Sequence, residues 1–160
     1  MSTISFYGGT GSVTGANFLL DTGESKILVD CGLIQGDRFA TTSNADPFVY
    51  EPSEVDVLLV THAHADHIGR IPKLVRDGFK GVIYSTPPTR DLVNVMFRDA
   101  YKVMLYEEER FGTPRIFEEK DIDNALALWK SHPYHDPFQL PGGVTATYTD
   151  AGHILGSGMI

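Results

Sequence analysis

Four side chains that bind metal ions well lie within six consecutive positions of the sequence. They belong to the stretch Thr61-His62-Ala63-His64-Ala65-Asp66-His67. Imidazole nitrogens and carboxylate oxygens are common ligands of zinc, and few other roles need so many of them in one short segment. The spacing therefore predicts a metal-binding group made of His62, His64, Asp66 and His67.

The alternative is that each residue has an ordinary structural role. A lone histidine is usually a packed or surface residue, and an aspartate before a helix is usually its N-cap. Four such donors directly after a buried strand would all lose solvation without any functional gain, which is costly. Metal binding is therefore favoured for the group as a whole.

Two elements must position this group. The apolar run 55–60 is typical of a short buried strand, and the pattern at 68–76 is typical of an irregular helix. In the turn between them, the first two histidines can point to one side while Asp66 and His67 approach a neighbouring point. We therefore expect two adjacent metal positions.

A second histidine motif follows another strand, which is expected at 144–150. The motif is Gly152-His153-Ile154-Leu155-Gly156-Ser157. At the same edge of the sheet, His153 would complete a three-nitrogen position with His62 and His64 and leave the fourth place to water. The alternative is an exposed surface histidine.

A third strand end carries Asp30, after an expected hairpin of 17–20 and 26–30. Ligating imidazoles usually donate their second N–H to a carboxylate or carbonyl, which fixes the tautomer. We expect Asp30 to support the ligands in this way, with an ordinary turn aspartate as the alternative. Cys31 is expected to be a small buried hydrophobe rather than a ligand.

The remaining pattern completes an α/β fold. Strands are expected at 3–7 and 81–84, and helices from the cap at 86–89 to about residue 110 and at 121–131. The longer helix should bury one apolar stripe, made of Leu92, Met96, Ala100 and Val103.

Two loops lie close to these motifs in the sequence. The backbone amides of Gly8–Gly15 are candidates to position a phosphate, but a hairpin follows where a dinucleotide site would need a helix. In the loop that follows the hairpin, Gln35, Asp37 and Arg38 are candidates to face the site.

Composition and charge limit the function classes. The 160 residues, 42% of them hydrophobic, fit one globular domain. A formal net charge of −8 argues against a broad basic face for nucleic acid. A polyanion would therefore have to be held locally, as bound divalent cations can do.

A single cysteine allows no intrachain disulfide. With no signal peptide or membrane-spanning run in the sequence, a cytoplasmic protein is expected.

Taken together, these motifs resemble the metallo-β-lactamase fold superfamily, whose hallmark is His-x-His-x-Asp-His, here His62 to His67. The whole chain is similar to the β-CASP branch of nucleic-acid-processing nucleases, in particular to RNA-specific relatives of the cleavage-and-polyadenylation endonuclease. The run Gly-His-Ile-Leu-Gly-Ser narrows the similarity to that RNA branch. The matching segments are 11–15, 30–33, 69–72, 86–92 and 152–157.

This resemblance implies the fold, the ligands and the chemistry. The fold would be the αββα sandwich of the superfamily. His62, His64 and His153 would hold one zinc, Asp66 and His67 would belong to a second, and Asp30 would support them. Asp66, His67 and His153 would thereby be catalytic. A zinc-bound hydroxide would then hydrolyse RNA phosphodiesters.

Other parts of the family pattern have no counterpart in the sequence: a bridging aspartate, a helical cap domain and further C-terminal histidines. We therefore expect residues 1–160 to be the N-terminal part of a metallo-β-lactamase domain, an incomplete fold without the β-CASP cap and C-terminal motifs. Only one of two zinc positions would be complete, and little activity is expected from this part alone. An exposed sheet edge would invite pairing with another chain, as in a homo-oligomer.

Two other functions use the same ligands. One is a superfamily hydrolase that acts on a thioester or a lactone. The other is a non-catalytic module that binds RNA or a partner while the metal is structural. Histidine-rich tetrahedral donors favour zinc in each case, and RNA is the expected substrate.

Overall fold

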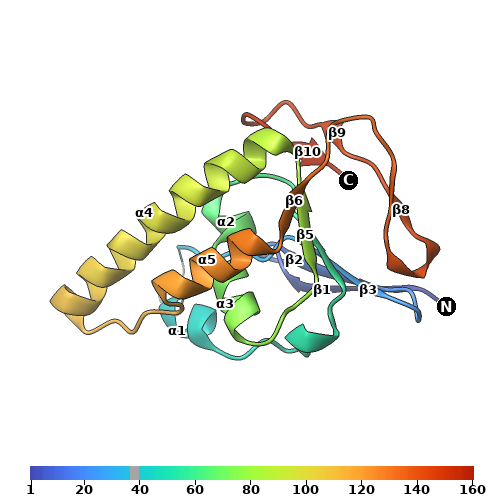
Figure 1. The fold of residues 1–160 in the computed structure, drawn as a ribbon. Helices are drawn as coiled ribbons and strands as arrows, with labels where there is room; N and C mark the ends of the chain where they lie inside the picture. Colours follow the sequence, from blue (N-terminus) through green and yellow to red (C-terminus); the bar gives the residue numbers. More distant parts are fainter. Residues whose placement is uncertain (37–39) are drawn as a thin grey trace.

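Six strands form one mixed sheet, in the order β1-β2-β3-β4-β5-β6 (Figure 1). The structure is a computed structural model that describes residues 1–36 and 40–160. The first three strands pair antiparallel, and β3 to β6 pair parallel. Their bounds are β1 (Thr3–Gly8), β2 (Asn17–Asp21), β3 (Lys26–Val29), β4 (Val57–Leu59), β5 (Val82–Ser85) and β6 (Trp129–Ser131).

The helices cover one face of this sheet (Figure 1). The main core lies between them, where Leu28, Leu58 and Ile83 of the sheet meet Phe97 and Ile122 of the two longest helices, all at most 1% exposed. The helices are α1 (Ala40–Ala45), α2 (Ala65–Ile68), α3 (Ile71–Arg76), α4 (Pro87–Phe111) and α5 (Glu119–Ala127), with short 3-10 turns at Pro52–Glu54 and Pro141–Gly143.

Short strand pairs cover the opposite face. Because side chains alternate along a strand, Ile27, Val57 and Leu59 point away from the helices and pack against Phe138 and Tyr148. The pairs are β7 (Phe138–Gln139) with β8 (Thr145–Ala146), and β9 (Thr149–Asp150) with β10 (Gly158–Met159). A helical layer, a sheet and short strand pairs on its other face make an α/β fold, in agreement with the first part of the expected αββα sandwich.

Most of the predicted strands are confirmed. The opening strand, the hairpin, the strand before the histidines and the strand at 81–84 correspond to β1, β2 with β3, β4 and β5. The irregular helix predicted at 68–76 is two pieces, α2 and α3, of which α2 begins at Ala65. The hydrophobic pattern located these elements because each buries a well-defined apolar face.

Two predicted elements differ from those in the structure. The second helix, expected at 121–131, ends at Ala127, and Trp129 begins strand β6 instead. Pairing with β5 and the bond from Trp129 Nε1 to Ser85 Oγ, at 2.8 Å, outweigh the local helical pattern. The strand expected at 144–150 is divided between β8 and β9, which pair with different partners.

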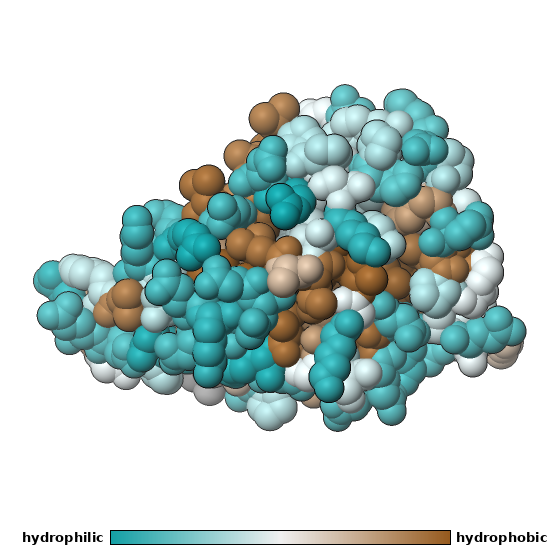
Figure 2. All heavy atoms as spheres, viewed as in Figure 1, coloured by the Kyte–Doolittle hydropathy of each residue, from teal (hydrophilic) through white to brown (hydrophobic). Residues whose placement is uncertain are grey.

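The apolar stripe of α4 is also placed differently. Val93 and Phe97 form its buried face, whereas Leu92, Met96 and Ala100 are only partly buried and Val103 is 49% exposed. The distal half of the helix extends beyond the sheet (Figure 1). Tyr101 and Met104 still pack against the core there, whereas Val103, Leu105 and Tyr106 are exposed. Figure 2 shows apolar atoms at the surface along this helix.

Strand β1 forms one edge of the six-stranded sheet and exposes Ile4 and Phe6. Pairing of an exposed edge with a second chain stays a prediction. Among the described helices, none combines the length and the apolar character needed to cross a membrane.

We predict that Gly32→Ala destabilises the protein by about 1–3 kcal/mol or more, the usual cost of overpacking. An added Cβ at Gly32 would lie 1.6 Å from the backbone oxygen of Asp66, so the start of α2 would have to move. Urea unfolding measures the loss. Gly11→Ala is the control, because it meets nothing within 4 Å and carries only the strain of its φ of +72°. Equal losses in the two variants would contradict the close approach.

Candidate metal centre

Three segments meet at one end of the central strands. Strand β3 leads to Asp30, and the neighbouring parallel strand β4 leads to the segment 61–67. The turn 151–157, which follows β9, reaches the same place, because the backbone N–H of Gly158 donates to the carbonyl of Thr61 at 2.8 Å. Ligand sites in sheets with parallel strands form at such carboxyl ends.

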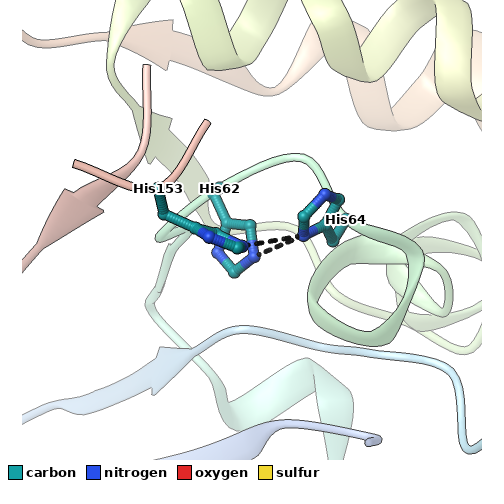
Figure 3. A group of neighbouring side chains, drawn as sticks. All are labelled: His62, His64 and His153. Carbon is teal, nitrogen blue, oxygen red and sulfur yellow. Dashed lines mark hydrogen bonds between the residues drawn. The ribbon is translucent and has the colours of Figure 1, made fainter. Parts of the chain in front are cut away.

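Three histidines from two of these segments converge (Figure 3). His62 Nε2 and His153 Nε2 each lie 3.1 Å from His64 Nδ1. One ligand nitrogen from each ring lies within 4.8 Å of the other two. His62 is buried, His64 is half-buried and His153 is exposed, so the group opens to solvent on the side of His153.

This spacing fits a zinc ion. Zinc–nitrogen bonds of about 2.0–2.1 Å at tetrahedral angles would place two ligand nitrogens roughly 3.4 Å apart. The observed separations of 3.1 Å from His64 Nδ1 are close to that value. The three rings can therefore serve as three ligands of one ion, and the group is open to solvent on the side of His153.

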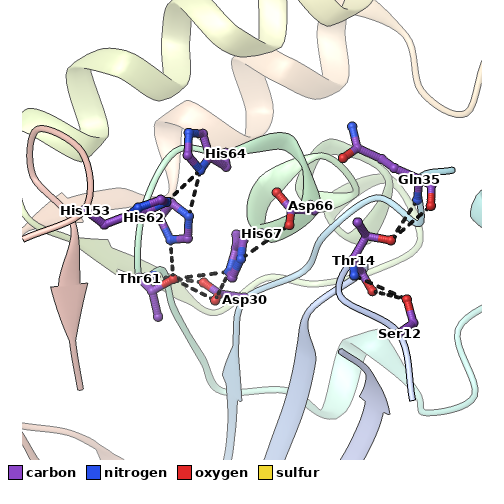
Figure 4. Close-up of polar contacts among 10 residues, drawn as sticks. All are labelled: Ser12, Thr14, Asp30, Gln35, Thr61, His62, His64, Asp66, His67 and His153. Atoms are coloured by element: carbon purple, nitrogen blue, oxygen red, sulfur yellow. Dashed lines mark hydrogen bonds and ion pairs between the residues drawn. The ribbon is translucent and has the colours of Figure 1, made fainter. Parts of the chain in front are cut away.

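Asp66 and His67 form a second pair of donors beside the first group (Figure 4). Asp66 Oδ2 lies 3.6 Å from His67 Nε2. The rings of His62 and His67 have their centroids 4.0 Å apart, so the two donor groups are adjacent. Asp66 and His67 occupy the first turn of α2, which begins directly after His64.

Asp30 connects both groups. It is 1% exposed and adopts a left-handed φ of 58°, a conformation that asparagine and aspartate tolerate better than most residues. Its Oδ1 accepts the backbone N–H of Thr61 at 2.8 Å. Its Oδ2 lies 2.7 Å from both Thr61 Oγ1 and His67 Nδ1.

These contacts assign the tautomers of two rings. A carboxylate only accepts hydrogen bonds, so Thr61 Oγ1 and His67 Nδ1 both donate to Asp30. With its proton committed, the Thr61 oxygen accepts from His62 Nδ1 at 2.9 Å. In the neutral form of either ring, Nδ1 carries the proton and Nε2 is free to bind a metal.

Electrostatics favours a neutral His62. Burial, together with the nearby rings of His67, His64 and His153, lowers the pKa of His62 to about 4. Burial also acts to lower the pKa of His67, but its hydrogen bond to Asp30 and the charges of Asp30 and Asp66 outweigh burial and raise that pKa. Neutral imidazole is the metal-binding form, so His62 is in that form near pH 7.

The other predicted residues lie outside the histidine group. Burial raises the pKa of the Cys31 thiol to about 12, and this residue packs in the core, as expected. Gln35 lies beyond Asp66, next to Thr14 of the glycine-rich loop (Figure 4). Asp37 and Arg38 lie outside the described residues. The phosphate role of Gly8–Gly15 stays a prediction.

Sequence reasoning missed Thr61 and Ser157. Thr61 precedes the motif, and its role depends on Asp30, which lies 31 positions earlier. Ser157 Oγ accepts the backbone N–H groups of His153 and Ile154 at 3.1 and 3.2 Å and so holds the turn. The sequence signals for these roles were a small hydroxyl residue directly before His62 and another four positions after His153.

Comparison with known proteins places these motifs in one family. The family model described as the metallo-beta-lactamase superfamily domain matches residues 19–159. The chain is 38% identical over 154 residues to a protein named Ribonuclease TTHA0252 from Thermus thermophilus, covering 96% of this chain and 33% of the relative. It is 35% identical over 155 residues to a protein named transcription termination factor FttA from Methanosarcina mazei, covering 94% of this chain and 23% of the relative. The chain thus spans about a quarter to a third of the length of these relatives.

Solved structures show the same fold. A subclass B3 metallo-beta-lactamase of Bradyrhizobium japonicum, BJP-1, aligns with a TM-score of 0.58 at 18% identity, over 99% of this chain and 53% of that chain. A beta-lactamase from Chitinophaga pinensis aligns with a TM-score of 0.59 at 19% identity, over 97% and 52%. At this identity the likeness concerns the fold alone.

The family model confirms the superfamily recognised from the sequence. The names of the relatives, a ribonuclease and a transcription termination factor, agree with the expected RNA-processing branch. By its sequence motifs, its sheet and its convergent histidines, the chain belongs to the metallo-beta-lactamase superfamily.

Proposed function

We propose that residues 1–160 are part of a metal-dependent ribonuclease that hydrolyses RNA phosphodiesters. The observation that carries the proposal is the convergence of His62, His64 and His153, from segments almost ninety residues apart, on one point. The relatives support RNA as the substrate class, since one is named a ribonuclease and another a transcription termination factor. A cytoplasmic location, as predicted, is part of the proposal.

In this proposal His62, His64 and His153 hold one zinc, and Asp66 and His67 contribute to a second. Bound there, zinc supplies a water of lowered pKa and neutralises charge on the phosphodiester in its transition state. The chain's own residues hold and orient these ions. Its net charge of −8 leaves the metal centre as the local positive charge that attracts a phosphate.

The exposed side of the site is where the substrate would enter. His153 is exposed and His64 is half-buried, whereas Asp30 and His62 are buried beneath them. A phosphodiester can therefore approach the ligands from solvent without disturbing the buried carboxylate. Asp66, His67 and His153 are the residues that we propose to act at the reacting atoms through the metals they hold.

We predict that His64→Ala in the full-length protein removes zinc from the three-histidine position and lowers RNA cleavage by more than about a hundredfold. Loss of a ligand should exceed the 10–100-fold effect typical of outer partners. Zinc content and cleavage of a labelled RNA are measured together. His135→Ala is the control, because this histidine is exposed and lies outside the group. RNA cleavage at the parent rate by His64→Ala would refute the proposal, as would turnover of a thioester or lactone but not of RNA by the parent.

We predict that Asp30→Asn lowers zinc affinity about 10–100-fold. The amide keeps the shape of the carboxylate, but it loses the charge and one of the acceptors that serve Thr61 and His67. Zinc affinity is measured by competition with a chelator. Asp56→Asn is a matched control, because Asp56 is an exposed carboxylate that accepts only the backbone N–H of Lys26 near the opposite end of β4. Equal zinc affinity in the two variants would contradict a supporting role for Asp30.

A further inference from the structure

We propose that Thr86 and Thr89, at the start of helix α4, are positioning residues that hold His153 against the other two histidines. The inference rests on the proposed metal site and adds to it the residues that keep its most exposed ligand, His153, in place. Figure 1 shows the start of α4 beside the turn between β9 and β10, which carries His153.

Both threonines direct their hydroxyls at one carbonyl of that turn. Thr86 Oγ1 lies 2.5 Å, and Thr89 Oγ1 lies 2.8 Å, from the backbone oxygen of Gly156. The two side chains are at most 1% exposed. Two buried hydroxyls that share one carbonyl form a specific contact, since a buried hydroxyl without a partner is costly.

Thr86 lies at the N-cap position of α4, but its side chain does not cap the helix. A threonine there normally accepts a backbone N–H of the first turn. The structure shows no such side-chain cap bond at Thr86. Pro87 and Pro88 occupy the first two helical positions and offer no N–H, and the Thr86 hydroxyl contacts Thr89 Oγ1 and the Gly156 carbonyl.

Gly156 permits the close approach. Its φ is +82°, and an added Cβ would lie 2.6 Å from the backbone nitrogen of Thr89 and 2.7 Å from its Oγ1. Only glycine fits both the conformation and the space. The segment 151–157, which carries His153, therefore packs directly against the first turn of helix α4.

The contact between this turn and α4 matters because packing in the core does not fix His153. The residue is exposed, and its ring has no surrounding core to fix it. Its place next to His64 depends on the turn, which Ser157 closes from within. The turn is attached to the rest of the protein at Gly156, at Gly158 and at the Ser157 carbonyl, which accepts from Tyr134 Oη at 2.7 Å. Loss of the threonine contacts should release the turn and move the His153 nitrogen away from the metal position, while His62 and His64 remain.

The experiment compares zinc affinity in full-length variants. The Thr86→Val and Thr89→Val double variant keeps the shape of both side chains but removes the hydroxyls. The Thr86→Ser and Thr89→Ser double variant keeps the hydroxyls. Ser85→Ala is the control for a lost buried hydroxyl, because Ser85 lies next to Thr86 but bonds to Trp129 and the Thr86 carbonyl and does not touch the turn. Zinc affinity is measured by chelator competition, and thermal unfolding of the metal-free protein is measured in parallel.

We expect the valine variant to lose about tenfold or more in zinc affinity, as for other residues that orient ligands. The serine variant should retain the parent affinity, and Ser85→Ala should lower only the unfolding temperature. Parent-like affinity in the valine variant, no rescue by serine, or an equal loss in Ser85→Ala would each overturn the inference. If the double valine variant does not fold, Thr89→Val alone is compared with Thr89→Ser by the same criteria.

His64→Ala, measured alongside, separates this inference from the proposed function. If His64→Ala binds zinc like the parent, the metal site itself is wrong. If His64→Ala loses zinc but the valine variant does not, the metal site stands and only the role of the threonines is wrong.

Discussion

The parallel pairing of β3 with β4 is the constraint on which the metal centre depends. It aligns Leu28 with Leu58 and Val29 with Leu59, so that Asp30 emerges beside Thr61 at the same edge. The backbone N–H of Asp30 donates to the carbonyl of Leu59. The Asp30 carboxylate accepts hydrogen bonds from the backbone N–H and the hydroxyl of Thr61. A shift of the register by one residue would reverse the faces of β3 and separate these groups.

From that alignment the carboxylate reaches both donor groups. It bonds directly to His67, and it reaches His62 through the Thr61 hydroxyl. One buried charge thus sets the orientation of a ring in each of the two adjacent groups. The backbone supports the same arrangement, because Cys31 and Leu33 pair with the carbonyls of His67 and Ala65 across the space that Gly32 leaves open.

The sequence alone was sufficient to locate motifs and elements whose residue pattern lies within one short segment. The six-residue spacing from His62 to His67 requires no tertiary information, and the apolar alternation of the hairpin located β2 and β3. Asp30 and His153 were identified from the rule that strand ends gather at one edge and from resemblance to a family. Both lie where that rule places them, within hydrogen-bond reach of the central cluster.

The sequence was insufficient where a distant partner decides. Trp129 continues a helical pattern, but parallel pairing with β5 makes it a strand residue. Thr86 looks like an ordinary helix cap, and only the folded chain brings Gly156 to its hydroxyl. The buried face of α4 is offset from the predicted stripe because Val93 and Phe97 are the residues that meet the core. In each case the deciding contact comes from outside the local sequence window.

In our proposal, imidazoles from two distant loops bind the same ion. The most direct measurement is anomalous diffraction at the zinc edge from crystals of the full-length protein grown with zinc. We expect a peak within about 2.0–2.1 Å of one nitrogen from each of His62, His64 and His153. A zinc peak coordinated by His62 and His64 while the His153 ring points away would contradict the proposal.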